Sequence, residues 1–184
     1  MDLFTAIATR ASAIKLREPA PTHEHLLQIL QAGAQAPDHG KLAPWRFTVI
    51  QNAARAELGE LIAQGLLRRN PAATDDELQR ERDKVMRVPC LIAVAAQIKK
   101  QHKIPEIEQV LAMGAAVQNM FLTAHALGYG VMWKTGPAAY DATVKAHLGV
   151  AEDDPIVALL YLGSIDVAGS PRTPTLDERV QWFE

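Results

Sequence analysis

Cysteine is almost absent from this chain, and neither sign of charge predominates. The 184 residues include one cysteine, Cys90, in the apolar run 90–94, which excludes an intrachain disulfide and favours a buried, inert thiol. Lys and Arg number 19 against 21 Asp and Glu, giving a formal net charge of -2. This balance offers no general attraction for nucleic acid or anionic lipid, so we expect neither as a partner.

Long apolar runs and low-complexity linkers are absent as well. The most apolar stretch, residues 104–127, contains Glu106, Glu108 and His125, a polar load that argues against a bilayer-spanning helix. The first ten residues lack the apolar core of a secretory signal, so we expect a cytoplasmic protein. Gly and Pro, 11 of each, are scattered between periodic segments, which favours a single domain over residues 1–184.

The spacing of apolar residues and the capping signals predict helices interspersed with short strands. Asp2 can cap a first helix, and Thr74 with Glu77 forms a capping-box pattern. We expect helices near residues 3–7, 22–30, 52–67, 74–86, 105–127 and 142–148, and strands at 47–50, 91–95, 131–133 and 156–162. These elements predict an α+β fold with a small mixed sheet, flanking helices and a long central helix, 105–127, enclosed on nearly all sides.

The usual catalytic signatures are absent from the sequence. It has no Gly-x-Ser-x-Gly elbow, no phosphate loop ending in Gly-Lys, no His-Glu-x-x-His and no paired-cysteine motif. The six histidines are dispersed, so we assign no metal site. No side chain is marked as an obligatory acid or base, so we assign no catalytic residue.

Three segments combine a cation or imidazole with small or turn-forming neighbours: 10–12, 37–46 and 133–136. Such groups can hold a phosphate and donate hydrogen bonds to a planar heterocycle, which suggests a phosphorylated aromatic cofactor. Each segment also has a structural interpretation. Arg10 can be a helix C-terminal cation, Asp38-His39 an Asx-type turn, and Trp133 a core aromatic.

Taken together, these segments resemble the FMN-dependent nitroreductase superfamily, in its short single-domain branch. The resemblance covers nearly the whole chain. It is carried by Arg10-x-Ser12, by Ala32-Gly33-x-x-Ala36-Pro37-Asp38-His39 followed by Pro44-Trp45, by His102-Lys103-x-Pro105 with Glu108-Gln109, by Gly130-x-x-Trp133, and by Leu160-Tyr161-Leu162-Gly163.

The resemblance implies an obligate homodimer with swapped terminal segments and two FMN sites at the interface. By matching position, FMN contacts fall at Arg10, Ala11, Ser12, Gln35, His39, Trp133, Lys134 and Thr135, with His39 reaching the flavin of the other subunit. A nicotinamide-nucleotide contact falls at Thr123, Ala124, His125, Ala126, Leu127 and Gly128. The apolar end of the chain, Val180, Trp182 and Phe183, also favours docking on a partner subunit.

The implied activity is ping-pong transfer of a hydride from NADH or NADPH to FMN, and then of electrons to a nitroaromatic, quinone or similar acceptor. Two cations common in the family are missing, because Ala11 and Gln35 stand where relatives carry Arg. Two alternatives therefore remain: an FMN-binding or storage protein without significant turnover, and a dimeric structural or interaction protein that has lost its flavin.

Overall fold

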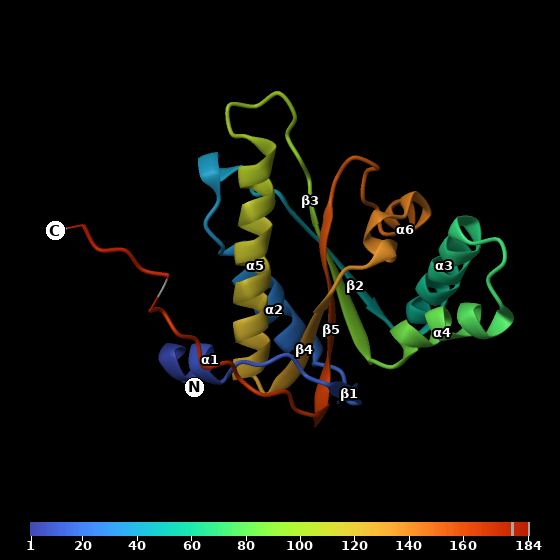
Figure 1. The fold of residues 1–184 in the computed structure, drawn as a ribbon, viewed down its shortest axis with the longest axis horizontal. Coiled ribbons are helices and arrows are strands. Elements are labelled where there is room, and N and C mark those ends of the chain that lie inside the picture. Colours follow the sequence, from blue (N-terminus) through green and yellow to red (C-terminus); the bar gives the residue numbers. More distant parts are fainter. Residues whose placement is uncertain (178, 184) are drawn as a thin grey trace.

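The computed structural model describes residues 1–177 and 179–183 (Figure 1). Its centre is a five-stranded sheet in which all strand pairings of the described residues are antiparallel. The strands are β1 (Lys15–Arg17), β2 (Trp45–Gln51), β3 (Cys90–Ala96), β4 (Tyr129–Lys134) and β5 (Ile156–Val167). β5 is the last of these in sequence, yet it pairs with β1, β3 and β4.

Helices cover both faces of the sheet, as Figure 1 shows. They are α1 (Leu3–Thr9), α2 (His23–Ala34), α3 (Ala53–Arg69), α4 (Asp75–Met86), α5 (Glu106–Ala126) and α6 (Ala142–His147). On one face α2 and α5 pack in a core that includes Ile29, Met113 and Met120. On the other face α3, α4 and α6 contribute Leu58, Val85 and Val144 to a second core.

β3 is buried along its whole length because it lies between these two layers. Covering both faces explains why its sequence is a continuous apolar run rather than an alternating one. Cys90 at its start is fully buried, and burial raises the pKa of its thiol to about 12. The thiol therefore stays protonated at neutral pH, as an inert core side chain does.

The α+β class is confirmed, and the predicted helices and strands appear within a few residues of their expected limits. Thr74 and Glu77 form the predicted capping box, and the Asp2 side chain accepts a hydrogen bond from the Thr5 N–H at 3.0 Å. The sheet differs from the prediction, being antiparallel within the chain rather than mixed, because strand direction depends on long-range pairing that local patterns do not encode. The three-residue strand β1 was not predicted, since it is too short to show a period.

The prediction that the long helix is enclosed was wrong for the single chain. Residues 107, 111, 114, 115 and 118 share one face of α5 by their i, i+4, i+7, i+8 and i+11 spacing. Ile107 and Leu111 are 63% and 65% exposed on that face, and a Cβ at Gly114 would meet no atom within 4 Å. This open face, called the α5 stripe below, is apolar except for Gln118 at one end and has small residues at its middle.

Further apolar side chains are exposed at the two ends of the chain. Phe4 of α1 is 83% exposed, and Trp182 and Phe183 in the C-terminal segment are exposed to a similar degree. Figure 1 shows this C-terminal segment (red) running outward past α1, away from the sheet. The chain itself therefore does not cover the apolar residues at its end.

Candidate functional site

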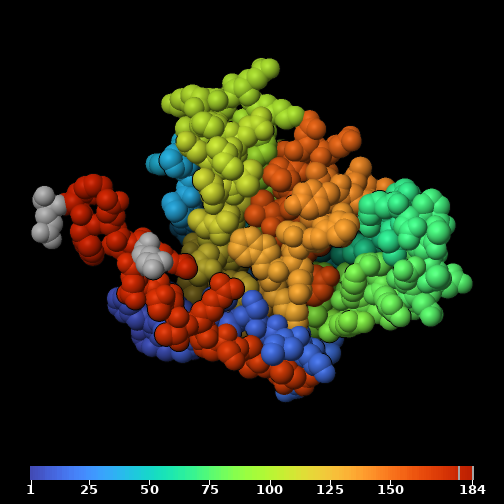
Figure 2. Space-filling view, viewed as in Figure 1, coloured from blue at the N-terminus to red at the C-terminus, as the bar shows by residue number. Residues whose placement is uncertain are grey.

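A cleft of about 1010 Å³ lies between one end of the sheet and the α3–α4 pair. Its sheet side is formed by β1, β4 and β5, and its rim by Gly136 and the 3₁₀ turn Pro137–Tyr140. In Figure 2 the orange segment that includes this turn lies between α5 (yellow) and the α3–α4 pair (green). Ligand pockets commonly measure about 300–1,000 Å³, so the cleft is large for a protein of this size.

The floor of the cleft is apolar. It is formed by side chains from the strands, from α3 and from the residue before β1, namely Ile14, Leu16, Ile62, Leu66, Met132 and Leu159. Tyr161 of β5 lies among them, and burial, followed by the nearby charge of Glu81, raises the pKa of its phenol to about 12. Tyr161 is therefore neutral at physiological pH, and its hydroxyl can donate or accept a hydrogen bond.

The charged side chains around this floor are mostly cationic. Five cations, Lys15, Arg69, Lys84, Arg87 and Lys134, line the cleft, against two carboxylates, Glu81 and Asp166. The chain as a whole has a net charge of -2, so positive charge is concentrated here. A cleft with low-dielectric walls and an excess of one sign of charge attracts ligands of the opposite sign.

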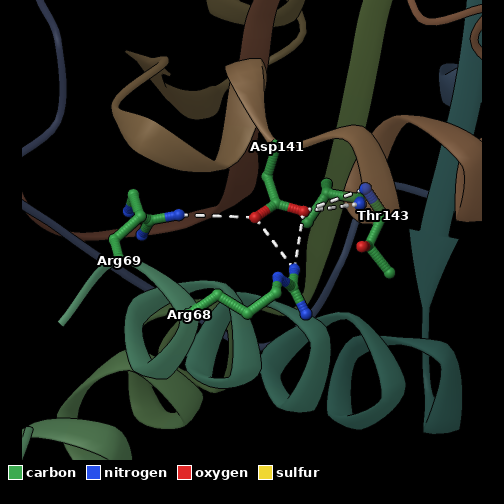
Figure 3. A network of polar contacts seen from close by, with 5 residues as sticks. Arg68, Arg69, Asp141 and Thr143 are labelled. Atoms are coloured by element: carbon green, nitrogen blue, oxygen red, sulfur yellow. Dashed lines mark hydrogen bonds and ion pairs between the residues drawn. The ribbon is translucent and has the colours of Figure 1, made fainter. Parts of the chain in front are cut away.

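Asp141 fixes the rim of the cleft to α3 (Figure 3). Both of its carboxylate oxygens accept hydrogen bonds from Arg68 at 2.9 Å, and Arg69 lies 3.4 Å away. The same carboxylate accepts from the N–H groups of Thr143 and Val144, which caps α6. Burial alone opposes ionisation of Asp141, but these hydrogen bonds and the Arg68 charge outweigh it, so the pKa is lowered.

Two of the three predicted cofactor segments lie close together. The Ala13 N–H donates to the Val131 carbonyl at 3.0 Å, which places Arg10, Ala11 and Ser12 beside the start of β4. Trp133 is two residues further along β4, about 7 Å at the rise of a strand. Lys134 and Thr135, which follow, line the cleft itself.

The N-terminal segment is held by contacts on both of its sides. The Arg10 guanidinium lies 4.9 Å from the centre of the Phe121 ring of α5, and Arg10 also ends α1. Gly169 packs so closely on the Ser12 carbonyl that a Cβ would come within 2.1 Å of its oxygen. Arg10 therefore meets its structural interpretation as a helix-end cation, and its role as a flavin contact stays a prediction.

The interpretation of Trp133 as a core aromatic is only partly met. Its indole N–H donates to the Val157 carbonyl at 3.0 Å, as a structural tryptophan would, yet the side chain is 44% exposed. Trp133 is therefore anchored at one edge and leaves much of its ring at the surface.

The third predicted segment lies elsewhere on the same chain. His39 is beside α5, with its Nδ1 3.1 Å from the Glu108 carboxylate, at a hollow of about 430 Å³ that Leu111 also lines. Gln35 is exposed at the end of α2. Glu108 and Phe121, the α5 residues that His39 and Arg10 contact, are thirteen positions apart, or about 20 Å along the helix. One chain alone does not bring His39 to Arg10.

Residues 123–128, the predicted nicotinamide contact, form the end of α5 and the two residues that follow it. Ala124 is fully buried, and His125 is 2.9 Å from the Thr9 hydroxyl through its Nε2. Ala126 and Gly128 are exposed, whereas Thr123 and Leu127 are partly buried. The segment can offer a ligand only its outer side, and its assignment stays a prediction.

The cleft residues contributed by β1, α3 and α4 were not predicted from the sequence. Lys15 lies on the unpredicted strand, and Arg69, Lys84 and Arg87 look like the solvated positions of ordinary amphipathic helices. No local sequence pattern marks these residues, because they come together only when α3 and α4 pack beside the sheet. Within residues 1–177 and 179–183, no three metal-binding side chains converge and no helix is long and apolar enough to cross a bilayer.

The sequence and the fold both have clear relatives. The model of the nitroreductase family matches residues 7–164. YdjA of Escherichia coli K12, provisionally named an NAD(P)H nitroreductase, is 37% identical over 171 residues, 92% of each chain. A Haemophilus influenzae protein with the same provisional description is 33% identical over 89% of each chain.

Solved structures extend the comparison. A nitroreductase-like protein of Bacillus cereus superposes with a TM-score of 0.83 at 24% identity, over 100% of this chain and 97% of the other. A Desulfovibrio desulfuricans protein, provisionally a nitroreductase and solved in complex with FMN, has a TM-score of 0.76 at 26% identity over 98% and 96%. The chain therefore belongs to the nitroreductase family, and its fold is the nitroreductase-like fold.

Proposed function

We propose that this protein is an FMN-dependent NAD(P)H oxidoreductase of the nitroreductase type, acting as a homodimer on a small electron acceptor. The observation that carries the proposal is the hydrogen bond from the Ala13 N–H to the Val131 carbonyl, which brings the Arg10–Ser12 segment beside β4, the strand whose end lines a large cationic cleft. The family and the provisional NAD(P)H nitroreductase descriptions of its relatives support the reaction class.

The residues present fit FMN. Lys15 and Lys134 supply positive charge for a phosphate or for the electron-rich edge of a reduced flavin, and the apolar floor suits a flat ring system. Gly136, at φ 68°, makes the turn that follows Thr135 at the rim of the cleft. When bound, FMN supplies the hydride-accepting ring, and the protein positions the two reactants against it in turn.

The missing family cations are partly offset by the cleft. Ala11 and Gln35 carry no charge, but Lys15, which was not among the predicted contacts, adds a cation to the cleft. Lys134 retains charge where a bidentate guanidinium would give a more directional contact. We propose that Lys134 tunes the flavin, because a cation near the pyrimidine edge stabilises the reduced, anionic form.

The assembly we propose follows from α5. Gly114 and Ala115 lie midway between Glu108, which contacts His39, and Phe121, which contacts Arg10. If two α5 stripes cross at this midpoint about a two-fold axis, each His39 approaches the other chain's Arg10 end. The open space at Gly114 and the exposed Leu111 favour such a close crossing. Each FMN site would then take residues from both chains.

The finer features of the function stay proposals. A nicotinamide contact at Thr123–Gly128 uses the outer side of the end of α5, the acceptor is a nitroaromatic, quinone or similar molecule, and the mechanism is ping-pong. The single domain and the cytoplasmic location also remain predictions. Because the described side chains mark no acid or base for the transfer, we propose that the second proton comes from water.

The test is a visible spectrum of the purified protein with and without added FMN, followed by anaerobic addition of NADH or NADPH. Bound flavin that loses its blue absorption on nucleotide addition is the expected result. Flavin that binds but stays oxidised would instead favour the storage protein. Protein that takes up no flavin would contradict the cofactor assignment and favour a structural dimer.

A further inference from the structure

The wall that α3 and α4 form along the cleft has a charge pattern that the proposed flavin contacts do not use. Arg69, Lys84 and Arg87 project from these helices into the lining, across from the sheet. Arg69 is engaged with Asp141 at 3.4 Å, and Lys84 with Glu81 at 2.5 Å. Among the described residues, Arg87 has no ion pair.

Arg87 is the residue at the C-terminal end of α4, and it is exposed. A cation is favourable at a helix C-terminus, which accounts for Arg87 in isolation. That effect does not account for its convergence with Lys84 and Arg69 on one cleft wall. A free guanidinium can hold a carboxylate or phosphate through two parallel hydrogen bonds, and neighbouring cations strengthen the site.

The cleft also has room beyond a cofactor. Its volume of about 1010 Å³ is at the upper limit of ordinary ligand pockets, and the floor between the two walls includes Leu66, Met132 and Tyr161. A flat reactant resting on this floor would have the β4 end on one side and the α3–α4 wall on the other. Its charged group would then face Arg87.

We propose that the α3–α4 wall is an anion-binding subsite, in which Arg87, with the Glu81-paired Lys84 beside it, holds the carboxylate or phosphate of a reactant that shares the cleft with the flavin. That the ligand is a reactant rests on the proposed function. That it is an anion rests on the cations of the wall alone. The favoured source is a small aromatic acceptor that carries an acidic group. The other source of the same chemistry is the 2′-phosphate of NADPH.

The experiment measures binding by calorimetry to the FMN-loaded protein, with matched probes and matched variants. Arg87→Gln removes the charge, and Arg80→Gln is the control because Arg80 is an exposed arginine of the same helix outside the lining. The probes are 4-nitrobenzoate against neutral 4-nitrobenzamide, and adenosine 2′,5′-bisphosphate against adenosine 5′-phosphate. Arg87→Glu provides a charge reversal at the same position.

We expect Arg87→Gln to weaken nitrobenzoate binding about three- to fivefold, as a partly exposed ion pair allows, and to leave nitrobenzamide unchanged. Arg87→Glu should weaken nitrobenzoate binding further, and Arg80→Gln should change neither ligand. If Arg87→Gln instead removes the tighter binding of adenosine 2′,5′-bisphosphate over adenosine 5′-phosphate, the subsite is retained and its ligand is the 2′-phosphate of the nucleotide.

Two results would overturn the subsite. One is equal binding of the charged and neutral probes in all variants. The other is a selective loss of FMN from Arg87→Gln, because the guanidinium would then hold the cofactor phosphate rather than a reactant. If the wild-type protein takes up no flavin, the same titrations are made on the flavin-free protein. If the flavin-free protein still binds the charged probe more tightly than the neutral one, and Arg87→Gln removes the difference, the subsite is retained although the proposed function fails.

Discussion

Replacing Leu111 by Asp is the sharpest test of the two-chain site. Leu111 lies on the α5 stripe, 65% exposed, one turn from Gly114 and beside the hollow that contains His39. If two stripes pack together, Leu111 is buried in both copies. The substitution then removes apolar contact and places a carboxylate in the same contact, whereas in a separate chain it only exchanges one exposed side chain for another.

The magnitude follows from the exposed area. Burying a whole leucine side chain contributes about 1.5–3 kcal/mol, so covering the exposed two-thirds of Leu111 contributes about 1–2 kcal/mol. A symmetric contact contains the side chain twice, which gives about 2–4 kcal/mol per dimer. The dissociation constant should therefore rise about 30- to 900-fold, and the desolvation of Asp adds to this value.

The assay is sedimentation velocity over a range of protein concentrations, combined with the flavin-to-protein ratio from absorbance. We expect Leu111→Asp to sediment as a monomer and to lose FMN in step with the dimer, since His39 no longer reaches the other chain's site. Leu67→Asp is the matched control, because Leu67 is 43% exposed on α3 in the other helical layer. A Leu111→Asp protein that stays dimeric, or a monomer that keeps its full flavin content, would refute the reasoning.

Three further predictions follow from the site. Lys134→Met should lower the flavin reduction potential or the FMN occupancy, because the cation at the end of β4 is lost; redox titration checks this, and no change in either quantity would rule out the tuning role. Gly169→Ala should weaken FMN binding, measured by fluorescence titration, because the added methyl group displaces the Ser12 carbonyl. The control protein Ala168→Ser, changed at the exposed neighbouring residue, should bind FMN as wild type does. Asp141→Ala should cost about 1–2 kcal/mol of unfolding free energy at pH 7, through the lost helix cap and the contact with Arg68. Because folding lowers the pKa of Asp141, its contribution is present at neutral pH and is lost as the pH falls below about 4. In urea titrations the difference in unfolding free energy between Asp141→Ala and wild type should therefore be smaller at pH 3.5 than at pH 7, and a larger difference in acid would contradict the assignment. Asp153→Ala is the control and should change stability little at pH 7, since the Asp153 carboxylate that pairs with Lys100 is exposed.

The parts of the fold that depend on neighbouring residues in sequence were predictable. Thr74 and Glu77 mark the start of α4 because a capping box uses groups three residues apart. β3 was predictable from its apolar run, since a strand covered on both faces needs no alternation. The family resemblance was also correct, because it depends on the order of several short motifs along the chain.

The parts that depend on distant residues were not predictable. The apolar pattern of α5 gives a helix with apolar residues on all sides, but it does not say which side another layer of the same chain will cover. Arg87 and Lys15 reach one cleft from α4 and β1, which are far apart in sequence. Their positions follow from packing of whole elements against the sheet, and no local spacing encodes that packing.

The central position of β5 has a consequence for how the protein is made. Because β5 pairs with β1, β3 and β4, these three strands lack a common partner until residues 156–167 have been synthesised. Of the strand pairings among the described residues, β2–β3 alone can form before that point. The nascent chain must therefore wait for its last strand before it closes its two cores, so a ribosome-bound chain that stops before residue 156 should remain open to proteolysis and to chaperones.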